Sequence, residues 1–144
     1  KGYIMKKILV SFVMLFSILS AEQKAVFDCA AGDMKFVLTR MKLIDMTAKE
    51  LKQKNIPYDF VLTIHSKCTP IVNKKSDNKD IKAIHQKLTQ LKREHNVKIE
   101  ACKIATNKFG YKKDDIISEA DIVKNSITRV IQLQNSGYAL IPYH

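Results

Sequence analysis

The sequence predicts an α/β fold with three layers, in which helices cover both faces of a mostly parallel sheet of about five strands. Two observations support this prediction. Short apolar or β-branched runs alternate along the chain with longer segments whose apolar residues recur every three or four positions, as strands alternate with helices. The chain after residue 21 also has the length of one ordinary domain, with room for one layered core. We therefore expect a single domain over 22–144.

The first half of this domain predicts a strand, a helix and a second strand. The first strand is expected at 25–27, and Asp33 can cap a helix that ends near Lys54. Residues 58–65 are rich in β-branched and aromatic side chains, which favours a buried strand. The apolar stripe of the helix has a 4-3-4-3 spacing and comprises Val37, Met41, Ile44, Ala48 and Leu51.

The middle of the chain repeats the pattern. An exposed loop is expected over 73–80, and Asp80 can cap a helix that ends at Asn96. Residues 97–102 predict the third strand. The apolar stripe of this second helix comprises Ile81, Ile84, Leu88 and Leu91.

The C-terminal part predicts shorter elements. A helix over about 103–109 precedes a brief strand at 121–123, and a last helix is capped by Asn125 or Ser126. A final short strand is expected at 138–142. The last helix carries a stripe at helical spacing that comprises Ile127, Val130, Ile131 and Gln134.

The first 21 residues predict a secretory signal peptide. Met5 is followed by two lysines, an uncharged run over 8–19 and small residues before Glu22, which is the order of the basic, apolar and cleavage regions of such a signal. An apolar run of about 12 residues is short for a membrane span, which needs about 20. Residues 1–4 are interpreted as an extension upstream of a start at Met5. We expect a periplasmic or secreted protein without stable membrane insertion after cleavage, and an uncleaved anchor helix stays open as the alternative.

The charge of the chain favours anionic partners. Its formal net charge is +11 at pH 7, and a basic surface attracts anions. Most lysines are scattered over predicted helices rather than gathered with aromatic residues, and export also argues against nucleic acid as a partner. The sequence contains no Walker loop and no G-x-G-x-x-G motif after the first strand. We therefore expect no cofactor.

Four residues that can carry chemistry follow predicted strands. Cys29, Cys68 and Cys102 each lie at or just past the end of a strand, and His65 ends the second strand. Ligands of parallel sheets gather outside the carboxyl ends of the strands. An odd number of cysteines in an oxidising compartment implies one bonded pair and one free thiol, or thiols with a function. The alternative is that the cysteines act as small buried hydrophobes, which applies most to Cys29.

Cys102 is the strongest candidate for a reactive thiol. It is expected where a strand passes into a helix, so unpaired backbone N–H groups and the positive end of the helix favour the thiolate. Lys103 adds a positive charge beside it. The thiolate is the form that attacks electrophiles and carries sulfur.

The segment around Cys102 resembles the DsrE/DsrF-like family of sulfur-relay proteins. In that family a strand delivers a cysteine to a short helix that contains alanine, a glycine closes the helix and an acidic residue follows, as in residues 99–117, IEACKIATNKFGYKKDDII. Residues 125–144 are similar to the family's last helix and strand, and 26–33 resemble its opening. The resemblance implies a three-layer α/β/α fold, assembly into homo- or hetero-oligomers, and a persulfide on Cys102.

On this interpretation the protein is an exported sulfur carrier or sulfurtransferase whose site comprises Cys102, Cys68 and His65. His65 is expected to hydrogen-bond or deprotonate the thiol, and Cys68 to cooperate with Cys102, to which it can form a disulfide. Sulfur donor and acceptor proteins or small sulfur anions are the expected partners, and a homo-oligomer is expected.

Two other function classes stay open. The first is a soft-metal site in which His65, Cys68 and Cys102 bind copper(I) or zinc. No C-x-x-C or H-x-x-x-H spacing supports it. The second is an oligomeric binding or structural protein with a Cys68–Cys102 disulfide and no chemistry.

Overall fold

The structure is a computed structural model that describes residues 20–144. Five parallel strands form one sheet in the order β4-β3-β2-β1-β5. The strands are β1 (Gln23–Cys29), β2 (Tyr58–Ile64), β3 (Lys98–Cys102), β4 (Ala120–Val123) and β5 (Ala139–Tyr143). The helices are α2 (Met34–Gln53), α3 (Lys79–His95), α4 (Lys103–Lys108) and α5 (Ser126–Asn135), with two short 3-10 helices, η1 (Ser66–Val72) and η2 (Lys113–Asp115).

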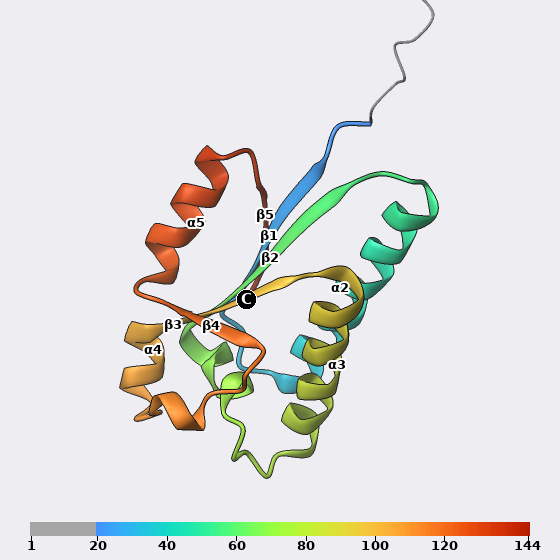
Figure 1. Ribbon diagram of the computed structural model, residues 1–144. Coiled ribbons are helices and arrows are strands. Elements are labelled where there is room, and N and C mark those ends of the chain that lie inside the picture. Colours follow the sequence, from blue (N-terminus) through green and yellow to red (C-terminus); the bar gives the residue numbers. More distant parts are fainter. Residues whose placement is uncertain (1–19) are drawn as a thin grey trace, which may run out of the picture.

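Helices cover both faces of the sheet, which confirms the predicted α/β architecture with a parallel sheet. Figure 1 shows α2 and α3 on one side of the strands and α5 with α4 on the other. Successive strand residues alternate between these faces. Phe27 and Leu62 belong to the large core under α2 and α3, whereas Val26 and Val61 pack against Leu133 of α5.

The two long helices follow the predicted stripes. The Asp33 side chain caps α2 by accepting hydrogen bonds from the backbone N–H groups of Lys35 and Phe36. Every stripe residue of α2 except the half-buried Leu51 is completely buried, and all four of α3 are buried. A polar contact also joins these helices: Nε2 of the buried His95 lies 2.8 Å from Asp45 Oδ1.

Two details of the predicted elements are wrong, and η1 is an element that was not predicted. Asn78, not Asp80, caps α3, because its side chain reaches the backbone N–H groups of Asp80 and Ile81. The segment after β2 forms η1 before the exposed loop begins. The buried face of α5 comprises Ser126 and Leu133, while Ile127 and Ile131 of the predicted stripe are 65% and 54% exposed.

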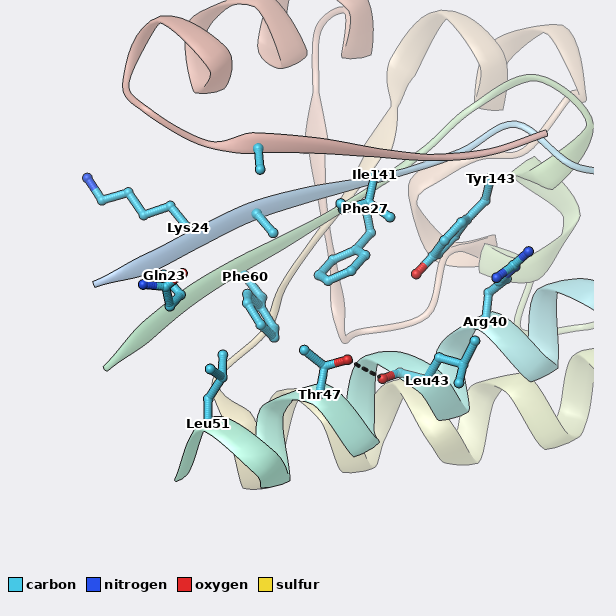
Figure 2. Close-up of a pocket in the computed structure, with 12 residues that line it drawn as sticks. Gln23, Lys24, Phe27, Arg40, Leu43, Thr47, Leu51, Phe60, Ile141 and Tyr143 are labelled. Carbon is cyan, nitrogen blue, oxygen red and sulfur yellow. Dashed lines mark hydrogen bonds between the residues drawn. The ribbon is translucent and has the colours of Figure 1, made fainter. Parts of the chain in front are cut away.

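The sheet extends beyond its helical cover at the β5 edge. There α2 and the strands leave an open groove, into which side chains of both layers point (Figure 2). Phe27 and Tyr143 form part of its wall on the sheet side.

The predicted signal peptide lies almost entirely outside the described residues. Within residues 20–144, no helix has both the length and the apolar character that crossing a membrane requires.

Candidate functional site

Cys102 ends β3 and directly precedes the first residue of α4. Its thiol is free, because the other two cysteines are bonded to each other, and the residue is 5% exposed. The strand end thus places one nearly buried thiol at the carboxyl edge of the sheet, where ligands of parallel sheets bind. This is the position predicted from the sequence.

The starts of two helices face the sulfur of Cys102. Burial raises the pKa of the thiol, since it disfavours the charged form, but hydrogen-bond donors around the sulfur lower the pKa below its ordinary value. These donors are the backbone N–H and hydroxyl of Ser126 and the backbone N–H groups of Ala105 and Ile104. The Cys102 side chain makes no capping hydrogen bond of ordinary geometry to α4. The donors therefore favour a negative charge on the sulfur.

The register of the sheet brings α5 to this position. β4 pairs with β3 so that Val123 lies opposite Cys102, and the chain enters α5 three residues later. Asn125 caps the helix by accepting a hydrogen bond from Ile127 N. One turn into α5, the Arg129 guanidinium binds both carboxylate oxygens of Glu100, at N–O distances of 2.8 to 3.1 Å. Because Glu100 is buried on the same face of β3 as Cys102, this ion pair fixes α5 beside the thiol.

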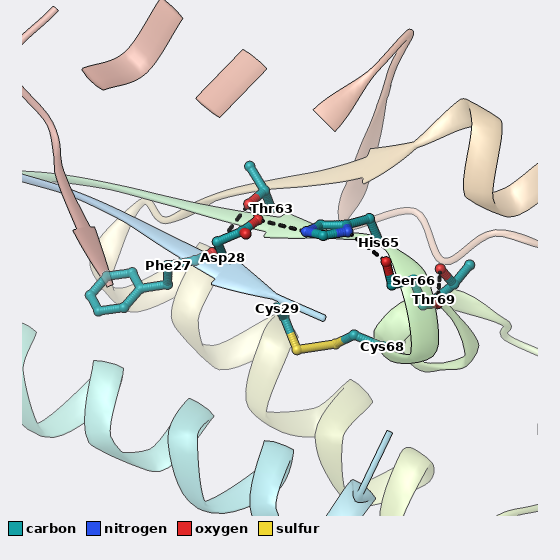
Figure 3. Close-up of a disulfide and its surroundings, with 8 residues drawn as sticks. All are labelled: Phe27, Asp28, Cys29, Thr63, His65, Ser66, Cys68 and Thr69. Atoms are coloured by element: carbon teal, nitrogen blue, oxygen red, sulfur yellow. Dashed lines mark hydrogen bonds and ion pairs between the residues drawn. A yellow bond between two sulfur atoms is a disulfide. The ribbon is translucent and has the colours of Figure 1, made fainter. Parts of the chain in front are cut away.

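A histidine–aspartate pair lies at the ends of the neighbouring strands. His65 Nε2 lies 2.9 Å from Asp28 Oδ1, which also accepts a 2.6 Å hydrogen bond from the Thr63 hydroxyl. Nδ1 of the ring lies 2.9 Å from Ser66 Oγ. Both side chains are largely buried, with 18% of His65 and 15% of Asp28 exposed. Figure 3 shows these groups in one row along the strand ends.

The negative charges of Asp28 and of the Cys102 thiolate favour the protonated form of His65. The hydrogen bond to Asp28 raises the pKa of His65 against the opposing effect of burial, and the negative charge of the Cys102 thiolate raises it further. Burial raises the pKa of Asp28, but the bonds from His65 and Thr63 lower it more. Protonated His65 and the Cys102 thiolate therefore favour each other's charged form.

The hydrogen bond expected between His65 and the Cys102 thiol is not formed. Both ring nitrogens already have partners, Asp28 and Ser66. The relation between His65 and Cys102 is therefore electrostatic: the Cys102 thiolate raises the pKa of His65 without a hydrogen bond between them.

The predicted pairing of Cys68 with Cys102 is wrong, because Cys68 forms a disulfide with Cys29 (Figure 3). The two Cα atoms are 5.8 Å apart, and both residues are completely buried. The physical reason is the alternation of side chains along a strand. Cys29 shares the parity of Phe27 and points into the core under α2 and α3, whereas Cys102 shares the parity of Glu100 and points toward α5.

The alternative metal site is not assembled either. Its three expected ligands were His65, Cys68 and Cys102, and the disulfide removes Cys68 from that set. Within residues 20–144, the one group of three metal-ligating side chains that lie close together is Asp45, Glu94 and His95. Asp45 in that group is already bound by His95 and the ammonium groups of Lys49 and Lys87. Cations therefore occupy the place where a metal would bind.

Comparison with known proteins agrees with this geometry. The model of the DsrE/DsrF-like family matches residues 24–143, nearly the whole of the described chain. The chain belongs to the DsrE/DsrF-like family. Its membership confirms the resemblance found around Cys102 and suggests a role in sulfur relay.

Individual relatives of this DsrE/DsrF-like chain support the fold. An uncharacterized protein of Aquifex aeolicus (strain VF5) is 36% identical over 146 residues, which cover 97% of this chain and 65% of the relative. The chain thus spans just under two thirds of that relative's length. Two solved structures share the fold at 17% identity and cover 84% of this chain and 99% of their own. They are the protein of unknown function MTH1491 from Methanobacterium thermoautotrophicum, with a TM-score of 0.71, and the ychN protein from E. coli, with a TM-score of 0.55.

Sequence reasoning about this DsrE/DsrF-like chain missed two residues of the site. Asp28 directly follows the first predicted strand at 25–27, and a carboxylate at the carboxyl edge of a parallel strand is itself a signal of a site. Ser126 was considered only as a helix cap. Its contact with Cys102 depends on the pairing of β4 with β3, which no local pattern reveals.

Proposed function

We propose that this protein carries sulfane sulfur as a persulfide on Cys102. The observation that carries the proposal is the free thiol at the end of β3, whose pKa is lowered by donors from the starts of α4 and α5. A lowered pKa supplies the thiolate, which is the nucleophile in sulfur transfer. Membership of a sulfur-relay family supports the same chemistry.

The transfer consists of two displacements. In the first, the Cys102 thiolate attacks the outer sulfur of a donor such as a persulfide, a polysulfide or thiosulfate. The new Sγ–S bond forms as the bond between that sulfur and the donor breaks, and the donor leaves with the electron pair as a thiolate, a shorter polysulfide or sulfite. In the second, an acceptor thiolate attacks the outer sulfur and Cys102 leaves as a thiolate. Neither step needs an external oxidant or reductant.

The surroundings of Cys102 suit an anionic sulfur carrier. The persulfide is an anion, so the donors that lower the pKa of the thiol also stabilise it. Protonated His65, held by Asp28, adds a positive charge at the same edge. Burial of Cys102 limits contact with bulk oxidants, which matters for a thiol outside the cytoplasm.

The Cys29–Cys68 disulfide fits an exported protein. Disulfides persist in oxidising compartments. This one bonds two of the three cysteines to each other, so that neither is available as a nucleophilic thiol. We propose accordingly that the protein works in the periplasm or outside the cell, and that Cys102 acts without a resolving cysteine of its own chain. The acceptor thiol then belongs to another molecule.

The experiment that tests this function measures sulfur uptake. The purified protein is treated with polysulfide or with thiosulfate, and its intact mass is recorded before and after a reductant. We expect a reductant-sensitive gain of one sulfur atom, lost in Cys102→Ser. The matched control is the double variant Cys29→Ser/Cys68→Ser, which should still gain the sulfur. Uptake that is unchanged in Cys102→Ser would refute the proposal.

We also propose that the protein assembles into a homo-oligomer through the outer face of α5. Ile127 and Ile131 lie one turn apart on this face and are 65% and 54% exposed, which is unusual for isoleucine. Light scattering tests the proposal: Ile131→Glu should reduce the particle mass, and Gln132→Glu, beside it on α5, should not. A monomeric parent protein at micromolar concentration would contradict it.

A further inference from the structure

A groove at the β5 edge of the sheet lies away from the sulfur site. It has a volume of about 490 Å³ and runs between α2 and the strands β1, β2 and β5 (Figure 2). Ser126 at the start of α5 is a donor to Cys102, and Figure 1 shows α5 on the face of the sheet opposite α2. A ligand in this groove therefore serves a function separate from sulfur transfer.

The walls of the groove are apolar over most of their length. Phe27 and Phe60 point into it from the sheet and pack edge to face, with ring centroids 5.1 Å apart. Leu43 and Leu51 line it from α2, and Thr47 lies between them with its hydroxyl bonded to the Leu43 carbonyl. The Thr47 side chain thus has no free donor, and this part of the groove suits an alkyl chain. Gln23 and Lys24 line the end of the groove near Leu51, where the Gln23 amide donates to the Ala21 carbonyl and the Lys24 ammonium to the Ser136 carbonyl.

One end of the groove carries unpaired polar groups. The Arg40 guanidinium lies 4.6 Å from the centre of the Phe36 ring and 5.5 Å from that of Tyr143, and no carboxylate of residues 20–144 forms an ion pair with it. Tyr143 is 4% exposed, but its hydroxyl, which makes no hydrogen bond within the described chain, points into the open groove and is accessible to solvent there (Figure 2). Burial raises the pKa of Tyr143 to about 12, so the hydroxyl stays protonated at neutral pH and remains a donor.

Within residues 20–144, the Arg40 guanidinium and the Tyr143 hydroxyl have no protein acceptor and face solvent in the groove. A planar guanidinium matches a carboxylate with two parallel hydrogen bonds, and partial burial strengthens such bonds. An anionic head group between Arg40 and Tyr143 would satisfy both. The remainder of the groove is mostly apolar, with Gln23 and Lys24 at its far end.

We propose that this groove binds a single unbranched alkyl chain that ends in a carboxylate, with the carboxylate at Arg40 and Tyr143 and the chain along α2 toward Leu51. From Arg40 to Leu51 the helix rises about 16 Å, close to the length of an extended chain of about a dozen carbons. The volume of the groove lies within the range of small-molecule sites.

The test uses dodecanoate, below its micelle concentration, as the probe in isothermal titration calorimetry with the purified protein. We expect saturable binding of one molecule per chain. Dodecanol and dodecyltrimethylammonium, which have the same tail without the anionic head, should bind at least about tenfold more weakly, because charge-assisted hydrogen bonds are the stronger ones. Equal binding of all three would overturn the proposed head-group site.

Variants locate the ligand. Arg40→Gln should weaken dodecanoate binding about tenfold or more, and Tyr143→Phe, which keeps the ring in place, about threefold or more. Lys42→Gln is the matched control, since Lys42 is a cation of the same helix that does not line the groove. Leu43→Trp should fill the groove and abolish binding, and circular dichroism verifies that each variant is folded.

A second copy of the chain is the competing occupant of the groove. Sedimentation velocity with and without dodecanoate distinguishes the two. Binding without a change in particle mass supports the proposal. Dissociation of an oligomer by Leu43→Glu, together with no binding of dodecanoate to the parent protein, would show that the groove is an interface between copies and would refute it.

Discussion

The backbone N–H of Ser126, the first residue of α5, faces the sulfur of Cys102, the last residue of β3. Twenty-four positions separate them in the sequence, and the pairing of β4 with β3 brings them together. The relationship links the fold to the chemistry, since the sheet register brings to the thiol two of the donors that lower its pKa.

Removal of the Ser126 hydroxyl should raise the pKa of Cys102. Ser126→Ala keeps the backbone N–H but loses one hydrogen-bond donor to the thiolate. The labelling rate of Cys102 should therefore reach half of its maximum at a higher pH than in the parent protein. The rate of iodoacetamide labelling against pH, read on the Cys102 peptide, measures this. Ser136→Ala, at the other end of α5, is the control and should leave the profile unchanged. A Ser126→Ala profile identical to that of the parent protein would show that the Ser126 hydroxyl does not lower the pKa of Cys102.

The Asp28–His65 pair should make His65 titrate above its ordinary pKa. Asp28→Asn removes the negative partner, so the pKa of His65 should fall. The stabilisation from protonated His65 is fully present below the unfolded pKa of about 6.5 and is lost as the pH rises through the higher folded pKa. NMR titration of the His65 ring in both proteins measures the change. A higher pKa in Asp28→Asn would contradict the ion pair.

Loss of the Cys29–Cys68 disulfide should destabilise the fold. The bond closes a loop with a sequence separation of 39, for which chain entropy gives about 4 kcal/mol of stabilisation. Urea unfolding of the parent protein and of Cys29→Ala/Cys68→Ala measures the difference. Cys102→Ala, which breaks no disulfide, is the control. A double variant as stable as Cys102→Ala would argue against the bond in the native protein.

The ionised carboxylate of Asp45 should make the stability of the fold depend on pH at the acid end. Burial raises the pKa of Asp45, but hydrogen bonds from Lys49, His95 and Lys87 lower it to about 2. Its stabilisation, about 2 kcal/mol, is present above the ordinary pKa near 3.8 and is lost as the pH falls toward 2. Asp45→Asn should therefore be less stable than the parent protein at pH 6 and nearly equal at pH 2. Unfolding by urea at both pH values checks this, and a difference independent of pH would contradict it.

The long elements could be predicted because their patterns are strong. In α2, Val37, Met41 and Ile44 lie at helical spacing and face one core. In α5, the stripe of Ile127 and Ile131 is offset by one position from the stripe of Ser126, Val130 and Leu133, so the local pattern allows either face to meet the sheet. Tertiary packing against Val26 and Val61 selects Leu133, and no local pattern contains that information.

The site could be predicted only in part. The junction of a strand with a helix identified Cys102, since local sequence decides where a strand ends. The partner of Cys68 depends on which face each strand residue takes. Successive strand residues point to opposite faces of the sheet. Phe27 and Ala101 face the core under α2 and α3, so Cys29 faces that core as well and Cys102 faces away from it. The turn of η1, which carries Cys68 to Cys29 below the sheet, left no comparable pattern.

The central claim is that Cys102 is the sulfur-bearing residue, and a peptide map tests it most directly. The protein is loaded with polysulfide, its remaining thiols and persulfides are alkylated, and the mass of each cysteine peptide is measured without reduction. The account predicts one added sulfur on the Cys102 peptide, with Cys29 and Cys68 recovered as one disulfide-linked pair. Added sulfur on Cys29 or Cys68 with an unmodified Cys102 would contradict it.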